Sequence, residues 1–158
     1  MKTALYVATV ARTYRKAIDD YLEDPKKYEA NMPWYLDQIS NCTYRQFTTG
    51  FYFGKPGDES QIYDSNTYVK EYTYLGIVGE KKDGMCRIEQ RNKFSVGEEI
   101  EIMKPDGGNV KTIVRRIVDE DSCEQESAPH PKQVLYVELD KEADIYDILR
   151  REEETSAS

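Results

Sequence analysis

Apolar side chains recur every three or four residues in the first part of the chain, a spacing typical of an amphipathic helix. The pattern predicts a helix from Ala4 to Leu22, which should end before Pro25 because helical backbone is disfavoured before a proline. A shorter helix is expected from Pro33 to Ile39, with a proline in its first turn. One face of the first helix is apolar and consists of Val7, Val10, Tyr14, Ala17, Ile18 and Tyr21.

After the helices the pattern changes to an alternation of period two, which is typical of β-strands. Turn signals at Lys82–Gly84 and Pro105–Gly108 separate neighbouring strands, and Asp119–Lys132 is a long polar loop. This rhythm predicts a mainly β fold with N-terminal helices, either a small antiparallel β-barrel or a sandwich. A disordered tail is expected from Arg150 to Ser158. The expected strands are Tyr44–Phe53, Val69–Gly79, Met85–Asn92, Glu99–Lys104, Val110–Val118 and Val134–Leu139.

The segment Cys42–Pro56 is unusually aromatic and holds three of the four phenylalanines of the chain. Read as a strand, it places Phe47, Phe51 and Phe53 on one face. Rings of this size are either buried or covered by a ligand or a partner. The segment is therefore either a core strand or a binding strip, in which Arg45 and neighbouring threonines would contact an anion or a backbone.

Charge is distributed unevenly along the 158 residues, which carry a formal net charge of −8. The first 79 residues hold 9 basic and 10 acidic side chains, and the remaining 79 hold 13 and 20. The acidic second half argues against strong autonomous binding to nucleic acid, so a basic patch is expected only in the first half. No apolar run is long enough to span a membrane. Three widely spaced cysteines fit a reduced, cytoplasmic setting.

The residue pattern predicts no catalytic group and no metal site. The single histidine, His130, lies between two prolines in the polar loop, and nothing beside it in sequence completes a nucleophilic triad. The cysteines lack the spacing of metal ligands. Tyr68, Tyr72 and Tyr74 share one strand face, where they would either stack nucleic-acid bases or pack the wall of a barrel.

Four segments carry a resemblance to a known family. Y-R-Q-F-T-T-G-F-Y-F-G, beginning at Tyr44, resembles a signature of the C-terminal domain of the collagenase-like peptidase family U32. The first 19 residues resemble the end of that family's catalytic domain. Residues 93–107 and 144–150 resemble its C-terminal β-domain and the end of that domain. The rhythm of residues 94–117 is also similar to the barrel of the second domain of elongation factor Tu.

The U32 resemblance implies an accessory domain without its catalytic domain. It implies a helical connector over residues 1–41, a β-barrel domain over 42–150 and a disordered tail over 151–158. The partner would be the catalytic domain of the parent chain, and the substrate would be a protein or RNA, because some members of the family resemble RNA-hydroxylating enzymes with an iron–sulfur cluster. The catalytic-domain cysteines have no matching positions here, so we expect neither a cofactor nor activity in this chain alone.

If the substrate is RNA, the expected contact residues are Arg45, Thr48, Thr49 and Tyr52. Two other hypotheses stay open at this point. The chain is either a purely structural domain that packs on the catalytic domain or, less in keeping with its composition, an autonomous hydrolase that uses His130. The sequence also leaves open whether the first helix packs on the barrel. An apolar helix face left exposed would favour dimerisation.

Overall fold

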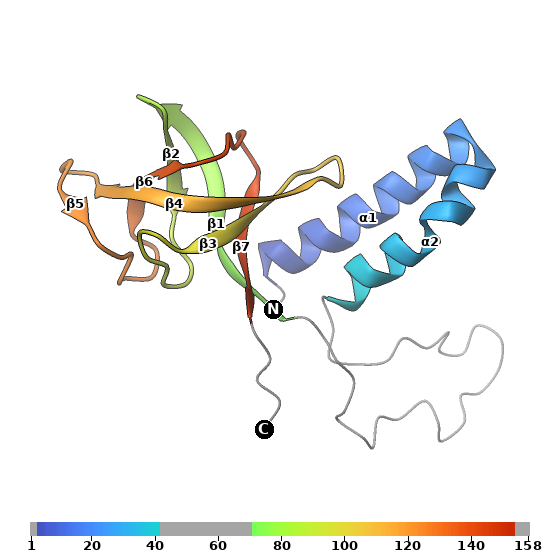
Figure 1. Ribbon diagram of the computed structural model, residues 1–158, viewed down its shortest axis with the longest axis horizontal. Helices are drawn as coiled ribbons and strands as arrows, with labels where there is room; N and C mark the ends of the chain where they lie inside the picture. The colour runs from blue at the N-terminus through green and yellow to red at the C-terminus, as the bar shows by residue number, and fades with distance from the viewer. Residues whose placement is uncertain (1–2, 42–70, 154–158) are drawn as a thin grey trace, which may run out of the picture.

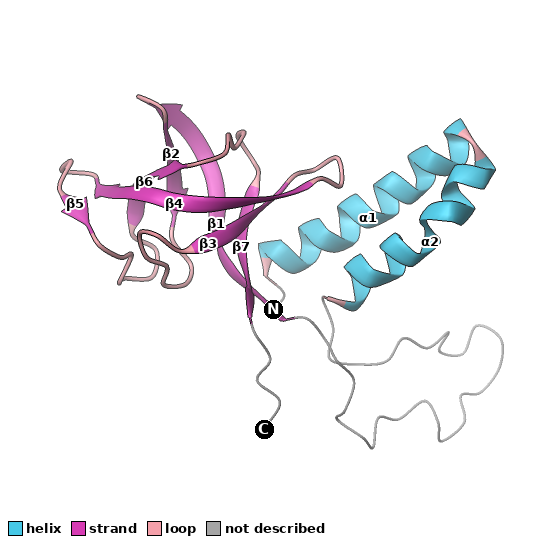
Figure 2. Ribbon diagram, in the orientation of Figure 1, coloured by secondary structure: helices cyan, strands magenta, loops and turns pink. Residues whose placement is uncertain are grey.

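The computed structural model describes residues 3–41 and 71–153. Two helices come first, α1 (Ala4–Glu23) and α2 (Pro25–Ser40), and they lie side by side at one end of a β-sheet (Figures 1 and 2). The expected strand Tyr44–Phe53 and the expected contact residues Arg45, Thr48, Thr49 and Tyr52 lie outside the described residues, so those expectations stay predictions. The strands are β1 (Glu71–Lys82), β2 (Met85–Glu89), β3 (Glu99–Met103), β4 (Asn109–Asp119), β5 (Glu124–Gln125), β6 (Val134–Leu139) and β7 (Ile148–Glu153).

The strands form an antiparallel sheet that closes on itself. Their order is β3-β7-β1-β2-β6-β4-β5, and an additional pairing of β3 with β4 joins six of them into a ring. Ile88, Leu135, Val137 and Leu149 fill the centre of this ring and are fully buried. The mainly β fold with N-terminal helices is confirmed, as are the turns at Lys82–Gly84 and Pro105–Gly108.

The last strand corrects the prediction of a tail that is disordered from Arg150 onward. β7 pairs with both β1 and β3, so the ring closes through residues of the expected tail. Arg150 is 1% exposed, and its guanidinium donates to the carboxylate of Glu101 and lies 3.9 Å from the centre of the Tyr72 ring. An arginine buried between a carboxylate and an aromatic face stabilises order rather than disorder.

The second helix is longer than predicted because it begins earlier, at a capping aspartate followed by a proline. Asp24 caps α2 by accepting a hydrogen bond from the backbone nitrogen of Lys26 at 3.0 Å, and Pro25 occupies the first helical position. Pro33, which had been taken as the start, lies inside the helix. α2 thus accommodates Pro33 in its interior, although a proline there cannot donate a backbone hydrogen bond and crowds the preceding turn.

α1 packs on the ring with the side opposite its apolar face. Its buried positions are mostly polar: Leu5, Thr9, Arg12, Thr13 and Asp20. The apolar face points outward, with Tyr14 60% and Ile18 53% exposed. The sequence left the packing of this helix open, because apolar periodicity identifies an amphipathic helix but not the neighbour that each face meets.

Arg12 attaches α1 to the strand ring. Its Nη1 donates to the backbone carbonyls of Lys104 (3.0 Å) and Gly108 (3.2 Å), which flank the β3–β4 turn. Its Nη2 donates to Gln38 of α2 at 2.6 Å, and the guanidinium lies 5.9 Å from the centre of the Trp34 ring. One buried cation therefore ties together both helices and the ring.

Asp20 closes the far end of the helical hairpin. Its carboxylate accepts hydrogen bonds from the hydroxyl of Tyr35 (2.6 Å) and the amide of Asn31 (2.9 Å), and it forms ion pairs with Lys16 and Lys27 at 3.2 Å each. These partners, the Tyr35 hydroxyl foremost, hold the pKa of Asp20 well below its ordinary range against the opposing effect of burial. Burial, together with the Asp20 carboxylate, raises the pKa of Tyr35 to about 12.

Asp20→Asn should destabilise the chain by about 2 kcal/mol, because it leaves buried donors without a charged acceptor. Urea denaturation followed by the fluorescence of Trp34, the only tryptophan, measures the loss. The neighbouring change Asp19→Asn is the matched control, since Asp19 pairs with Arg15 in solvent. Equal denaturation midpoints for the two variants would contradict the assignment.

The Asp20–Tyr35 pair predicts that the stability of the chain falls at both low and high pH. The pKa of Asp20 is lowered by folding, so its contribution is complete above pH 3.8 and declines as the pH falls further. The pKa of Tyr35 is raised, so its contribution is complete below pH 10.0 and is lost as the pH rises toward about 12. Because the two groups share a hydrogen bond, we expect both stability differences, wild type against Asp20→Asn and wild type against Tyr35→Phe, to shrink in acid, where Asp20 is protonated, and in alkali, where Tyr35 loses its proton. Differences that do not vary with pH would count against this coupling.

Candidate functional site

The structure describes the single histidine and two of the three cysteines that the sequence analysis considered. His130 lies in an exposed loop, where its backbone carbonyl accepts from Gln133. Cys86 is buried, and this burial raises the pKa of its thiol. Within residues 3–41 and 71–153, no three His, Cys, Asp or Glu side chains gather as a metal site would require, and neither helix is long and apolar enough to cross a membrane.

An ion-pair network fixes the loop before β7. Lys104 Nζ contacts Asp144 at 2.8 Å and the buried Asp147 at 2.9 Å, and Lys81 reaches Asp144 from the other side at 3.2 Å. The hydrogen bonds that Lys104 donates to these two carboxylates raise its pKa well above the ordinary value. The network holds Tyr146 with a φ of 76°, a left-handed conformation that is uncommon for a bulky residue. These charges are matched within the loop, so they serve to shape it.

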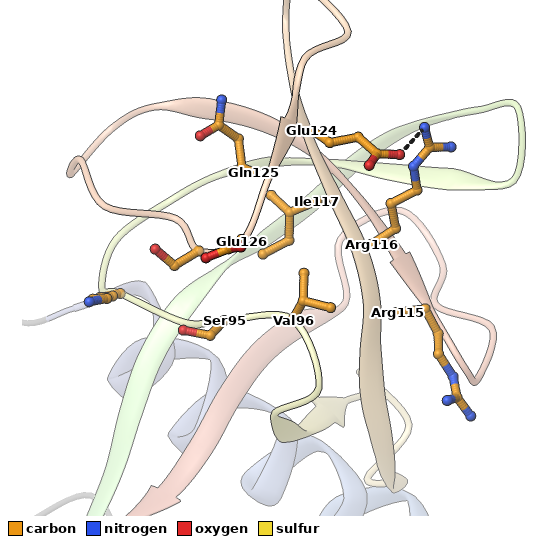
Figure 3. A pocket seen from close by; sticks show the side chains of 10 residues that line it. Ser95, Val96, Arg115, Arg116, Ile117, Glu124, Gln125 and Glu126 are labelled. Atoms are coloured by element: carbon orange, nitrogen blue, oxygen red, sulfur yellow. Dashed lines mark ion pairs between the residues drawn. The ribbon is translucent and has the colours of Figure 1, made fainter.

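A pocket of about 800 Å³ opens on the outer side of the ring between β4, β5 and the loop before β3 (Figure 3). The loop is held against the β5 segment by a backbone hydrogen bond from Val96 to Glu126 (3.0 Å) and against β4 by one from Gly97 to Val114 (2.8 Å). Gly97 has a φ of 84°, which suits glycine. The lining residues are Lys93, Ser95, Val96, Arg115, Arg116, Ile117, Glu124, Gln125, Glu126 and Ser127.

A β-bulge in β4 gives the pocket two adjacent cations. The register with β6 shifts between Val114 and Arg116, and the alternation of buried and exposed residues shifts with it. Arg115 and Arg116 are consequently both exposed, although successive strand residues normally point to opposite faces. The sequence analysis missed this site, but two successive arginines inside an otherwise alternating strand were a readable signal of a bulge.

Both arginines have acidic partners at the rim of the pocket. Arg116 pairs with Glu124 at 2.6 Å, as the dashed line in Figure 3 marks, and Arg115 pairs with Asp140 at 2.7 Å. The four side chains are between 41% and 70% exposed. Ion pairs this exposed contribute little to stability, so the arginines are held in place but are available to a competing anion.

A second surface lies on α1, and we call it the outer face. It consists of Val7, Tyr14, Ile18, Tyr21 and Leu22, each more than half exposed. The first four positions are seven, four and three residues apart, which is the spacing of a seam that packs against another element, and Leu22 adjoins the last of them. Large apolar side chains gathered in this way are typical of a surface that another protein segment covers.

The two parts of the chain match two models of one protein family. Residues 70–150, just over half of the chain, match the model of the peptidase family U32 C-terminal domain. The chain belongs to peptidase family U32. Residues 1–62, which include both helices, match a separate model described as peptidase family U32. The U32 resemblance of the sequence is therefore confirmed.

The U32 relatives are longer proteins with names that refer to RNA. The tRNA hydroxylation protein P1 of Bacillus subtilis (strain 168) is 34% identical over 153 residues, which are 96% of this chain and 36% of the relative. The tRNA hydroxylation protein P of Escherichia coli (strain K12) is 33% identical over 113 residues, 67% of this chain and 23% of the relative. The chain thus spans 36% and 23% of the length of these two relatives.

A solved structure belongs to the same U32 domain. The crystal structure of the C-terminal domain of a U32-family protein from Geobacillus thermoleovorans is 29% identical, with a TM-score of 0.46. It aligns with 51% of this chain and with 91% of its own.

Proposed function

We propose that this chain is a non-catalytic accessory part of a U32-family protein that acts on tRNA. In this proposal the helical hairpin joins the chain to a catalytic domain, and the strand ring helps to position the RNA. The observation that carries it is the outer face of α1, an apolar seam in the segment that matches the family model rather than the C-terminal domain model. A cytoplasmic location accords with a tRNA substrate.

The outer face favours a catalytic domain as its partner over a second copy of the chain. The polar face of α1 is occupied by Arg12 and the ring, so α1 would lie between the ring and whatever covers its apolar side. The family model that includes both helices ends at residue 62, and the C-terminal domain model begins at residue 70. The helices therefore match the part of the family that precedes the β-domain, where a catalytic domain would continue the packing.

RNA is favoured over a protein as the substrate by the relatives. Two proteins that are 33% and 34% identical to this chain carry names that refer to tRNA hydroxylation. The autonomous hydrolase hypothesis receives no support from the surroundings of His130, which lies exposed in a loop. A purely structural domain stays an alternative, and it differs from our proposal in predicting no contact with RNA.

Ile18→Asp should prevent the chain from binding the part of the Bacillus subtilis relative that lies outside the aligned segment. An aspartate in an apolar interface would lose its hydration without gaining a partner, and we expect at least a tenfold weaker association in analytical ultracentrifugation. Ile145→Asp is the matched control, since Ile145 is 50% exposed on the ring. A different outcome would identify the outer face as a dimer interface. In that case the chain would associate with itself and not with the relative, and Ile18→Asp would abolish the self-association.

A further inference from the structure

We propose that the pocket between β4 and β5 receives a single-stranded nucleotide of RNA. Arg116 binds one phosphate of the strand, Arg115 binds another, and the base lies over Val96. This inference rests on the RNA substrate of the proposed function and assigns that substrate a site. It also moves the expected contact from the aromatic segment Cys42–Pro56 to the opposite half of the chain.

The size and lining of the pocket suit a nucleotide that has left its stack. Its volume of about 800 Å³ lies within the range of small-molecule sites and exceeds what a phosphate alone requires. Val96 is 43% exposed at the pocket, and the buried Ile117 lies behind it, so one wall is apolar. Bases in single-stranded loops are recognised by an apolar or aromatic surface together with hydrogen bonds to their edges.

The polar groups around this wall can contact the edge of a base. Ser95 and Ser127 bring hydroxyl groups from the two segments that form the isolated β-bridge. Glu126 adds a carboxylate, which accepts hydrogen bonds from exocyclic amino groups. The combination of hydroxyls, a carboxylate and an apolar wall distinguishes this pocket from a site that binds only an anion.

The cations beside the pocket suit the phosphates of an RNA strand. The bulge exposes two successive arginines whose guanidinium groups point in opposite directions (Figure 3), so each can bind a separate phosphate, and guanidinium binds phosphate oxygens in a bidentate manner. Their present partners, Glu124 and Asp140, are exposed and so are displaced at low cost. Lys93 provides a third cation in the lining of the pocket.

The acidity of the chain restricts where RNA can bind. With a net charge of −8, most of the surface repels phosphates, so non-specific binding should be weak. The lining of the pocket reverses this balance locally, with three cations against two carboxylates. A local site on an otherwise acidic protein favours recognition of one nucleotide over coating of a long strand.

The test is a titration of fluorescently labelled tRNA with the wild-type chain and with the double variant Arg115→Gln/Arg116→Gln. We expect the double variant to bind at least tenfold more weakly at low salt. The slope of log affinity against log salt should also fall by about 1.4, or about 0.7 for each lost phosphate contact to a single strand. The matched control is Arg15→Gln/Lys26→Gln, which removes two exposed cations from the helical hairpin and should bind as wild type does.

Val96→Asp tests the base-contacting wall separately. It should weaken binding to a single-stranded oligonucleotide and leave the residual binding to duplex RNA unchanged, because a duplex offers no unstacked base. Thermal denaturation of each variant confirms that the fold is retained. Any of three results would overturn the inference. The wild-type chain does not bind tRNA, the pocket and control variants weaken binding equally, or the chain binds unfolded protein in place of RNA.

The two proposals fail in different ways. Loss of tRNA binding in the pocket variants should leave the association with the catalytic part intact, because the pocket and the outer face lie on different elements. Normal association through Ile18 without any effect of the arginines on RNA would refute the pocket alone. Failure of Ile18→Asp to change association would refute the docking proposal and leave the RNA measurements interpretable.

Discussion

The burial of Arg12 is the constraint on which the rest of this structure depends. A guanidinium cannot shed its charge inside a protein, so it must find acceptors wherever it is buried. The carbonyls of Lys104 and Gly108 and the amide of Gln38 meet this requirement, and they belong to the ring and to the second helix. Once these contacts form, α1 has only one possible orientation, with its polar side inward and its apolar side outward.

Two surfaces with different chemistry follow from that orientation. The outer face is apolar and continuous, and it lies on the helical hairpin. The pocket is mixed in charge and lies on the ring, where the strand pairing of β4 is interrupted. A contact with another protein segment and a contact with an RNA strand can thus be made without competing for the same residues.

The sequence was informative where structure follows from local rules. The start of α1, the turn at Lys82–Gly84 and the strands β2, β3, β4 and β6 were predicted within a few residues, because caps, glycines and alternation act over short distances. The packing of α1 stayed open, because the identity of a helix's neighbour is a tertiary property. β7 was missed for a related reason, since Arg150 is ordered by Glu101 and Tyr72, which are distant in sequence. The pocket depends on a bulge that only the pairing of β4 with β6 reveals.

Gly107 sets the angle between the two parts of the molecule. It lies in the β3–β4 turn with a φ of 100°, and a Cβ atom at this position would come within 2.8 Å of the Lys16 side chain and 3.2 Å of the Trp34 ring. Any larger residue would act as a wedge between the hairpin and the ring. A substitution at this one position would therefore change the distance between the outer face and the pocket without altering either surface.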